Sequence, residues 1–111
     1  VSDLDAAVAW YRDVLGLPLL FSFPTVAFFD CGGVRLMLAR HDQAGTESLL
    51  YFKVSDLRQT CATLAARGVR FVQDAQRVHT HEDGSEEWMA FFNDPEGRPL
   101  ALMARQAPGS A

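Results

Sequence analysis

Two spacings of hydrophobic positions run through this chain, one typical of helices and one typical of strands. Two segments carry apolar residues at i, i+4 and i+7, which predicts two amphipathic helices. These residues are Leu4, Val8 and Tyr11 in the first segment, and Leu57, Cys61 and Leu64 in the second. Each helix is expected to begin at a serine cap, Ser2 or Ser55, and to end at a glycine, Gly16 or Gly68.

Short apolar or alternating runs on either side of these helices predict seven strands. Two turn signals separate some of them, Gly32-Gly33 and the segment Asp94-Pro95-Glu96-Gly97. The strands are expected at 17–23, 25–30 and 34–40 in the first half, and at 49–54, 69–73, 87–92 and 100–104 in the second.

The chain also repeats itself. Val1-Ser2-Asp3-Leu4 recurs 53 residues later as Val54-Ser55-Asp56-Leu57, and Ala27-Phe28-Phe29-Asp30 recurs as Ala90-Phe91-Phe92-Asn93. Caps, stripes and strands match in the same order, which predicts an α+β fold of two tandem βαβββ units. The first unit is expected to lack its opening strand. The predicted division of this single domain is unit one 1–40, linker 41–48, unit two 49–105 and tail 106–111.

Composition and charge exclude several classes of protein. The 111 residues carry ten Lys and Arg against fourteen Asp and Glu, a net charge of −4, which argues against sequence-independent binding of nucleic acid. No apolar run approaches the roughly 20 residues of a membrane span. The two cysteines, Cys31 and Cys61, have neither zinc-finger nor C-x-x-C spacing, so a reduced, cytoplasmic setting is expected.

The repeated blocks resemble the vicinal oxygen chelate superfamily, which contains glyoxalase I, bleomycin-resistance proteins and extradiol dioxygenases. The resemblance covers nearly the whole chain and implies a cupped mixed sheet with helices outside. It rests on Val1-Ser2-Asp3-Leu4-Asp5-Ala6-Ala7, Trp10-Tyr11-Arg12-Asp13-Val14-Leu15-Gly16, Phe52-Lys53-Val54-Ser55-Asp56-Leu57, Ala65-Ala66-Arg67-Gly68-Val69 and Phe92-Asn93-Asp94-Pro95-Glu96-Gly97.

The resemblance also implies where a metal ion would be held. Metal-dependent members use four inward-facing side chains, on the first and last strand of each unit. Three of those positions correspond here to Met37, Leu49 and Ala101, and the fourth would precede Val1. Leucine and alanine cannot ligate, and a thioether prefers soft metals. We therefore expect no metal and no cofactor.

The same positions predict an apolar ligand cleft on the concave face of the sheet. Two of its residues carry positive charge, Arg35 and Lys53. Each could extend to water, which is the commoner behaviour, or meet an anionic ligand. The predicted cleft residues are Arg35, Met37, Leu49, Tyr51, Lys53, Ala101 and Met103.

His79, His81 and Glu82 lie in a polar stretch, 76–87, with a turn signal at Asp83-Gly84. This stretch is predicted to be an exposed loop. Two alternatives remain open: a pair of histidines that binds metal, and a flap over the cleft in which His79 or His81 meets a ligand or acts as an acid or base.

These observations favour a small-molecule binding protein of the bleomycin-resistance type, independent of metal, with an apolar or aromatic ligand. An alternative is a glyoxalase-like lyase or isomerase, or a dioxygenase, using metal or His79 and His81. A third is a module whose cleft is closed. Open strand edges favour pairing of chains, so a homodimer is expected.

Overall fold

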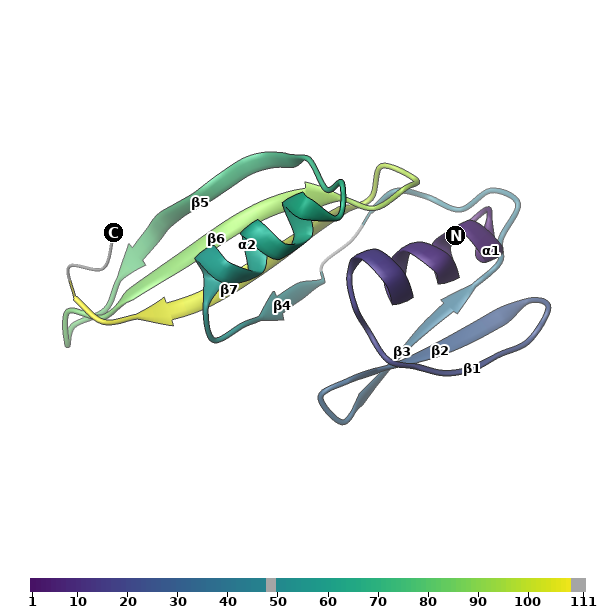
Figure 1. Ribbon diagram of the computed structural model, residues 1–111, viewed down its shortest axis with the longest axis horizontal. Coiled ribbons are helices and arrows are strands. Elements are labelled where there is room, and N and C mark those ends of the chain that lie inside the picture. Colours follow the sequence, from purple (N-terminus) through teal and green to yellow (C-terminus); the bar gives the residue numbers. More distant parts are fainter. Residues whose placement is uncertain (48–49, 109–111) are drawn as a thin grey trace. The chain divides into compact units, whose positions relative to one another are not determined.

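The computed structural model describes residues 1–47 and 50–108 and has a mixed α+β fold, as the sequence predicts. The chain divides into two compact units. Unit 1 comprises Val1–Glu47 and Asp94–Arg98, and unit 2 comprises Ser48–Asn93 and Pro99–Ala111. Figure 1 shows one helix lying against the sheet in each unit. The finer sequence-based division, with its linker and tail, stays a prediction.

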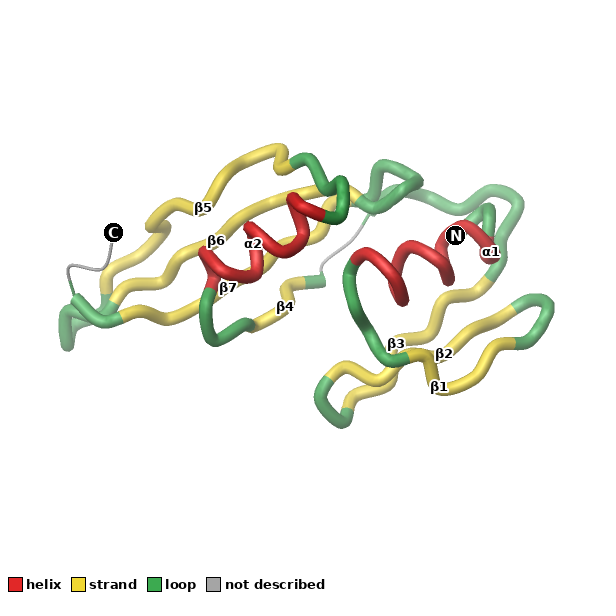
Figure 2. The backbone as a smooth tube through the Cα atoms, in the orientation of Figure 1, coloured by secondary structure: helices red, strands yellow, loops and turns green. Residues whose placement is uncertain are grey.

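Unit 1 holds a helix and three strands. Helix α1 (Leu4–Ala9) continues through a π-helical turn, Trp10–Val14. An antiparallel sheet follows, built in the order β1-β2-β3. Its strands are β1 (Leu19–Ser22), β2 (Val26–Cys31) and β3 (Val34–Ala39), drawn in yellow in Figure 2.

The helices begin one residue later than the sequence analysis expects. Asp3, not Ser2, caps α1 by accepting a hydrogen bond from the backbone N–H of Ala6. In unit 2, Asp56 rather than Ser55 does the same for α2 (Leu57–Ala66). The prediction of serine caps is therefore wrong, because a neighbouring aspartate offers a charged acceptor to the positive end of the helix.

The core of unit 1 lies between α1 and one face of the sheet. Ala27 and Phe29 on β2 are fully buried, and Tyr11 packs its ring 6.0 Å from that of Phe29. Successive residues of a strand point to opposite faces. The neighbours of these buried residues, Phe28 among them, therefore lie on the face that has no helix.

Unit 2 follows the βαβββ order. Its sheet runs β4-β7-β6-β5, with β4 parallel to β7 and the other pairs antiparallel. Helix α2 packs against β5, β6 and β7 and covers one face of the sheet. The buried residues of that face include Ala90, Phe92, Leu100 and Leu102. The strands are β4 (Tyr51–Lys53), β5 (Phe71–Thr80), β6 (Glu86–Asn93) and β7 (Pro99–Gln106).

The repeat in the sequence is also present in the backbone. The N–H of Val54 donates to the carbonyl of Met103, and Val1 makes the corresponding bond to Ala39. The carbonyl of Val1 also accepts from the N–H of His41, which completes the pattern of a parallel pair. Val1 thus lies beside the end of β3 as Val54 lies beside β7.

One segment differs clearly from its prediction. The polar stretch 76–87 is not a loop, because β5 continues to Thr80 and β6 begins at Glu86. His79 pairs with Glu87 across this hairpin. The turn at Asp83-Gly84 is confirmed, with a positive φ of 85° at Gly84. Backbone pairing with β6 here outweighs the polar composition of β5, which sequence periodicity cannot weigh.

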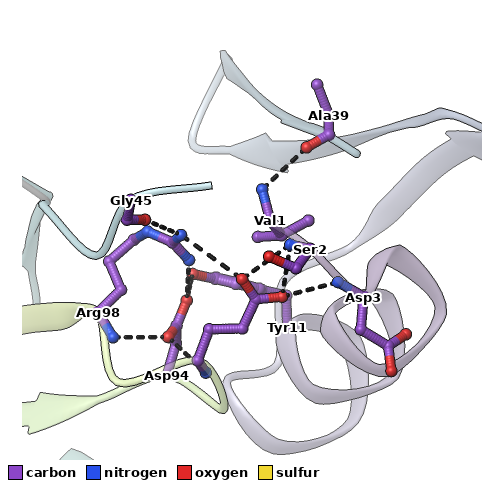
Figure 3. A network of polar contacts seen from close by, with 9 residues as sticks. Val1, Ser2, Asp3, Tyr11, Ala39, Gly45, Asp94 and Arg98 are labelled. Carbon is purple, nitrogen blue, oxygen red and sulfur yellow. Dashed lines mark hydrogen bonds and ion pairs between the residues drawn. The ribbon is translucent and has the colours of Figure 1, made fainter. Parts of the chain in front are cut away.

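A buried polar cluster holds unit 1 together, and Figure 3 shows it. The Asp94 carboxylate accepts from the Tyr11 hydroxyl at 2.9 Å and from the Arg98 guanidinium at 2.6 Å. It also accepts from the backbone N–H groups of Glu96 and Arg98. A buried charge with this many donors is well compensated.

Glu96 belongs to the same cluster and binds the chain just before α1. Its carboxylate accepts from the backbone N–H groups of Ser2 at 2.8 Å and Asp3 at 2.9 Å. Burial acts to raise the pKa of Glu96, but these hydrogen bonds, together with nearby positive charges such as Arg98, outweigh it, so the pKa lies below its ordinary value. Burial and the neighbouring Asp94 also raise the pKa of Tyr11, which keeps its hydroxyl protonated.

Replacing Glu96 by glutamine is expected to lower the melting temperature at neutral pH by a few degrees, about 1 kcal/mol, because the charged acceptor is lost. The folded-state pKa is depressed, so this stabilisation is present above the unfolded value near 4.5 and is lost as the pH falls through the folded value. Thermal melts of both proteins between pH 7 and pH 3 should therefore converge in acid.

Glu82→Gln is the matched control, since Glu82 is exposed beside the turn of the β5–β6 hairpin. It should leave the melting temperature unchanged at every pH. An equal effect of the two substitutions would contradict the assignment of Glu96 as the acceptor for the N-terminal segment.

Candidate functional site

The predicted cleft residues of unit 1 lie on its helix-free side. Met37 pairs with Phe28 across β2 and β3, and Phe28 pairs with Phe21 on β1. Directly paired residues share a face, so these three side chains form a row across the sheet. Met37 is 55% exposed and Phe21 is 40% exposed. We call Phe21, Phe28, Arg35 and Met37 the open face of unit 1.

The predicted residues of unit 2 also share one face, except Leu49, which lies outside the described residues. Tyr51 pairs with Ala101 and Lys53 pairs with Met103. On the other side of β7, Ala101 pairs with Phe91 and Met103 with Met89. We call Tyr51, Lys53, Met89, Phe91, Ala101 and Met103 the open face of unit 2.

Ala101 is fully buried although no helix covers its face. Its two neighbours in the row are Tyr51 and Phe91, whose strands stand two spacings apart, about 9.5 Å. The ring centroids of Tyr51 and Phe91 are only 6.4 Å apart, in an edge-to-face arrangement. The rings therefore lean toward each other over Ala101 and close the space above it.

These positions do not fit the divalent ion that the vicinal oxygen chelate resemblance implies. Ala101 has no donor atom, and the rings of Tyr51 and Phe91 stand over it. Met37 offers only an exposed thioether, which hard and borderline cations do not favour. Within residues 1–47 and 50–108, no three His, Cys, Asp or Glu side chains form a group that could hold a metal.

The two predicted histidines meet at the end of unit 2 where β5 turns into β6. Their rings stand 4.8 Å apart, edge to face. His81 Nε2 lies 3.0 Å from an Oε1 atom of Glu87, and both side chains are partly buried. Glu87 lies on β6 two residues before Met89, so the pair is at one end of the open face of unit 2. The segment to which the flap alternative was assigned is therefore the end of a β-hairpin, and the flap itself stays a prediction.

Sequence reasoning missed Glu87 and did not separate core aromatics from exposed ones. Phe28 and Phe29 are adjacent, yet Phe29 is fully buried and Phe28 lies on the open face. The signal was present in the register: Phe28 lies opposite Met37, the residue already assigned to the cleft. Glu87 had no such signal in the sequence. Its contact with His81 depends on the length of β5, which extends further than the sequence analysis expects.

A separate shallow hollow of about 320 Å³ lies in unit 1 beside the start of α1. Its lining is mostly polar and includes none of the predicted cleft residues. The lining residues are Ser2, Asp3, Leu4, Asp5, Pro24 and Arg40.

No helix in the described part of the chain is long and apolar enough to cross a membrane.

Comparison with known proteins agrees with this architecture. A family model described as Glyoxalase/Bleomycin resistance protein/Dioxygenase superfamily matches residues 1–102. A lactoylglutathione lyase from Agrobacterium tumefaciens is 25% identical, with a TM-score of 0.72 over 94% of this chain and 87% of that chain.

Two further solved structures share the fold at lower identity. A glyoxalase/bleomycin resistance protein/dioxygenase from Alicyclobacillus acidocaldarius is 21% identical, with a TM-score of 0.75 over 94% of this chain and 84% of that chain. A genomically encoded fosfomycin resistance protein from Listeria monocytogenes is 16% identical, with a TM-score of 0.68 over 94% and 85%. At these identities the likeness concerns the fold.

Two of the metal-ligand positions of the resemblance, Met37 and Ala101, should respond differently to the same substitution. Ala101→Glu is expected to destabilise the protein by about 2 kcal/mol or more, because it forces a carboxylate under the rings of Tyr51 and Phe91. Met37→Glu should cost less than about 0.5 kcal/mol, because Met37 is exposed. Urea unfolding of the two variants measures the difference, and equal costs would show that the rings do not close over Ala101.

The two histidines are also expected to differ. His81→Ala should lower the free energy of unfolding by about 1 kcal/mol, because it leaves the partly buried Glu87 without its partner. His79→Ala should change it by less than about 0.5 kcal/mol, because His79 is exposed. Denaturant unfolding at pH 7 tests this, and a larger loss at His79 would reverse the assignment.

Proposed function

Because the chain belongs to the Glyoxalase/Bleomycin resistance protein/Dioxygenase superfamily, we propose that it binds an apolar or aromatic small molecule on its open sheet faces, independently of metal. One observation carries the proposal. Each unit covers one face of its sheet with a helix and leaves the other lined by aromatic and methionine side chains, including Phe21, Met37 and Tyr51. Exposed apolar surface of this kind marks a site of interaction.

Independence of metal is supported by the chemistry of the side chains. An open catalytic site usually keeps about three protein ligands. Two of the positions that the resemblance assigns to ligands, Met37 and Ala101, supply no oxygen or nitrogen. The ligand would then be held by apolar contact and by the few polar groups of the same faces, such as Lys53.

Native mass spectrometry of protein purified from cells tests this proposal. We expect a retained organic molecule, or an empty protein that takes up an aromatic compound, with no bound metal. We also propose a homodimer, which the same spectrum reports as twice the chain mass. One equivalent of metal retained after dialysis against a chelator would contradict independence of metal.

A second candidate function is acid–base catalysis, as in a lyase or isomerase. It is favoured by the 3.0 Å contact between His81 and Glu87, because a carboxylate that orients an imidazole is a common feature of general bases. The solved lactoylglutathione lyase makes formation of lactoylglutathione a natural first assay. Turnover that Glu87→Gln abolishes, while binding of the substrate persists, would favour catalysis over binding alone.

A further inference from the structure

The open face of unit 1 combines an aromatic surface with a cation, Arg35, that has no acidic partner among residues 1–47 and 50–108. Phe21, Phe28 and Met37 form one row across its three strands. The rings of Phe21 and Phe28 have centroids 5.0 Å apart, with planes tilted by 50°. Together they present an aromatic patch that an apolar molecule can contact.

Arg35 lies on β3, yet its guanidinium is over the ring of Phe21 on β1, with Cζ 5.6 Å from the ring centroid. Strand β2 separates the two, so the side chain extends over β2 and across the open face. This placement keeps the positive charge beside the aromatic patch through a cation–π contact.

A carboxylate is available to Arg35 but does not bind it. Asp30 is its direct cross-strand neighbour, and the Asp30 side chain instead accepts from the backbone N–H of Gly33 in the turn. Among the described residues, the guanidinium of Arg35 makes no ion pair or hydrogen bond. Its five N–H donors are therefore available to a ligand.

The internal repeat shows that the fold does not require this cation. Gly33 corresponds to Gly97 and Met37 to Ala101, which places Arg35 opposite Pro99 in unit 2. Proline has neither charge nor side-chain donor. An arginine specific to one copy therefore points to a role of its own, not to a structural need of the βαβββ unit.

We propose that the open face of unit 1 binds an aromatic carboxylate, with the ring on Phe21, Phe28 and Met37 and the carboxylate on Arg35. A guanidinium matches a carboxylate with two parallel hydrogen bonds, and the apolar side chains beside Arg35 offer contact to the ring of the same ligand. This inference rests on the proposed function and names the chemical class of its ligand.

The test compares 2-naphthoate with its uncharged isostere 2-naphthamide, by calorimetric or fluorescence titration of the full chain. We expect 2-naphthoate to bind about tenfold more tightly, because a charge-assisted hydrogen bond contributes about 1.4 kcal/mol or more. Arg35→Gln should abolish this preference and leave binding of 2-naphthamide intact. Arg58→Gln, on the exposed surface of α2, is the charge-matched control and should leave the preference unchanged.

The alternative results are distinguishable. Equal affinity of the two probes in the wild type, or an unchanged preference in Arg35→Gln, would contradict the inference that Arg35 binds a carboxylate. Neither result would contradict the proposed function. Binding of neither probe would count against both the inference and the proposed function. If instead light scattering shows a dimer that Arg35→Gln or Met37→Glu dissociates, while 2-naphthoate does not bind, the face is an interface between copies and the inference is wrong.

Discussion

The structure depends on one constraint: each sheet has two faces, and the described residues of each unit supply one helix to cover them. Strands expose alternate residues to opposite sides, so covering one face leaves every second residue of each strand without a helix to pack on. In unit 1, α1 buries Ala27 and Phe29 and leaves Phe28 and Met37 open. In unit 2, α2 buries Leu100 and Leu102, while Met103 on the same strand stays partly accessible.

The two open faces differ in how far the protein's own side chains cover them. In unit 2, the rings of Tyr51 and Phe91 close over Ala101, so part of the face is filled by the protein's own side chains. In unit 1 the corresponding position is Met37, which stays exposed on the same face as Phe21 and Arg35, whose guanidinium forms no ion pair with any described residue. The scaffold is duplicated, but the surface chemistry of its two copies is not, and this asymmetry is what favours a specific ligand in unit 1.

Much of this was available from the sequence, and the reasons for the remainder are physical. The repeat of Val1-Ser2-Asp3-Leu4 at Val54 predicted the order of elements, because a helix stripe and a strand alternation have different periods. The length of β5 could not be predicted, since His79 is held in a strand by its pairing with Glu87 and not by its own preference. The burial of Asp94 could not be predicted for the same reason, because its hydrogen-bond donors include Tyr11, 83 residues away in the chain.

Binding of apolar molecules to the open faces without a metal ion can be measured directly at the three methionines. Met37, Met89 and Met103 are the only methionines in the chain, and all lie on the open faces. Methyl NMR of protein labelled at methionine and alanine, titrated with 2-naphthamide in the presence of a chelator, should shift the Met37 signal and leave the buried methyls of Ala27 and Ala90 unmoved. A Met37 signal that responds only after Zn²⁺ or Mn²⁺ is added, or that never responds, would contradict the account.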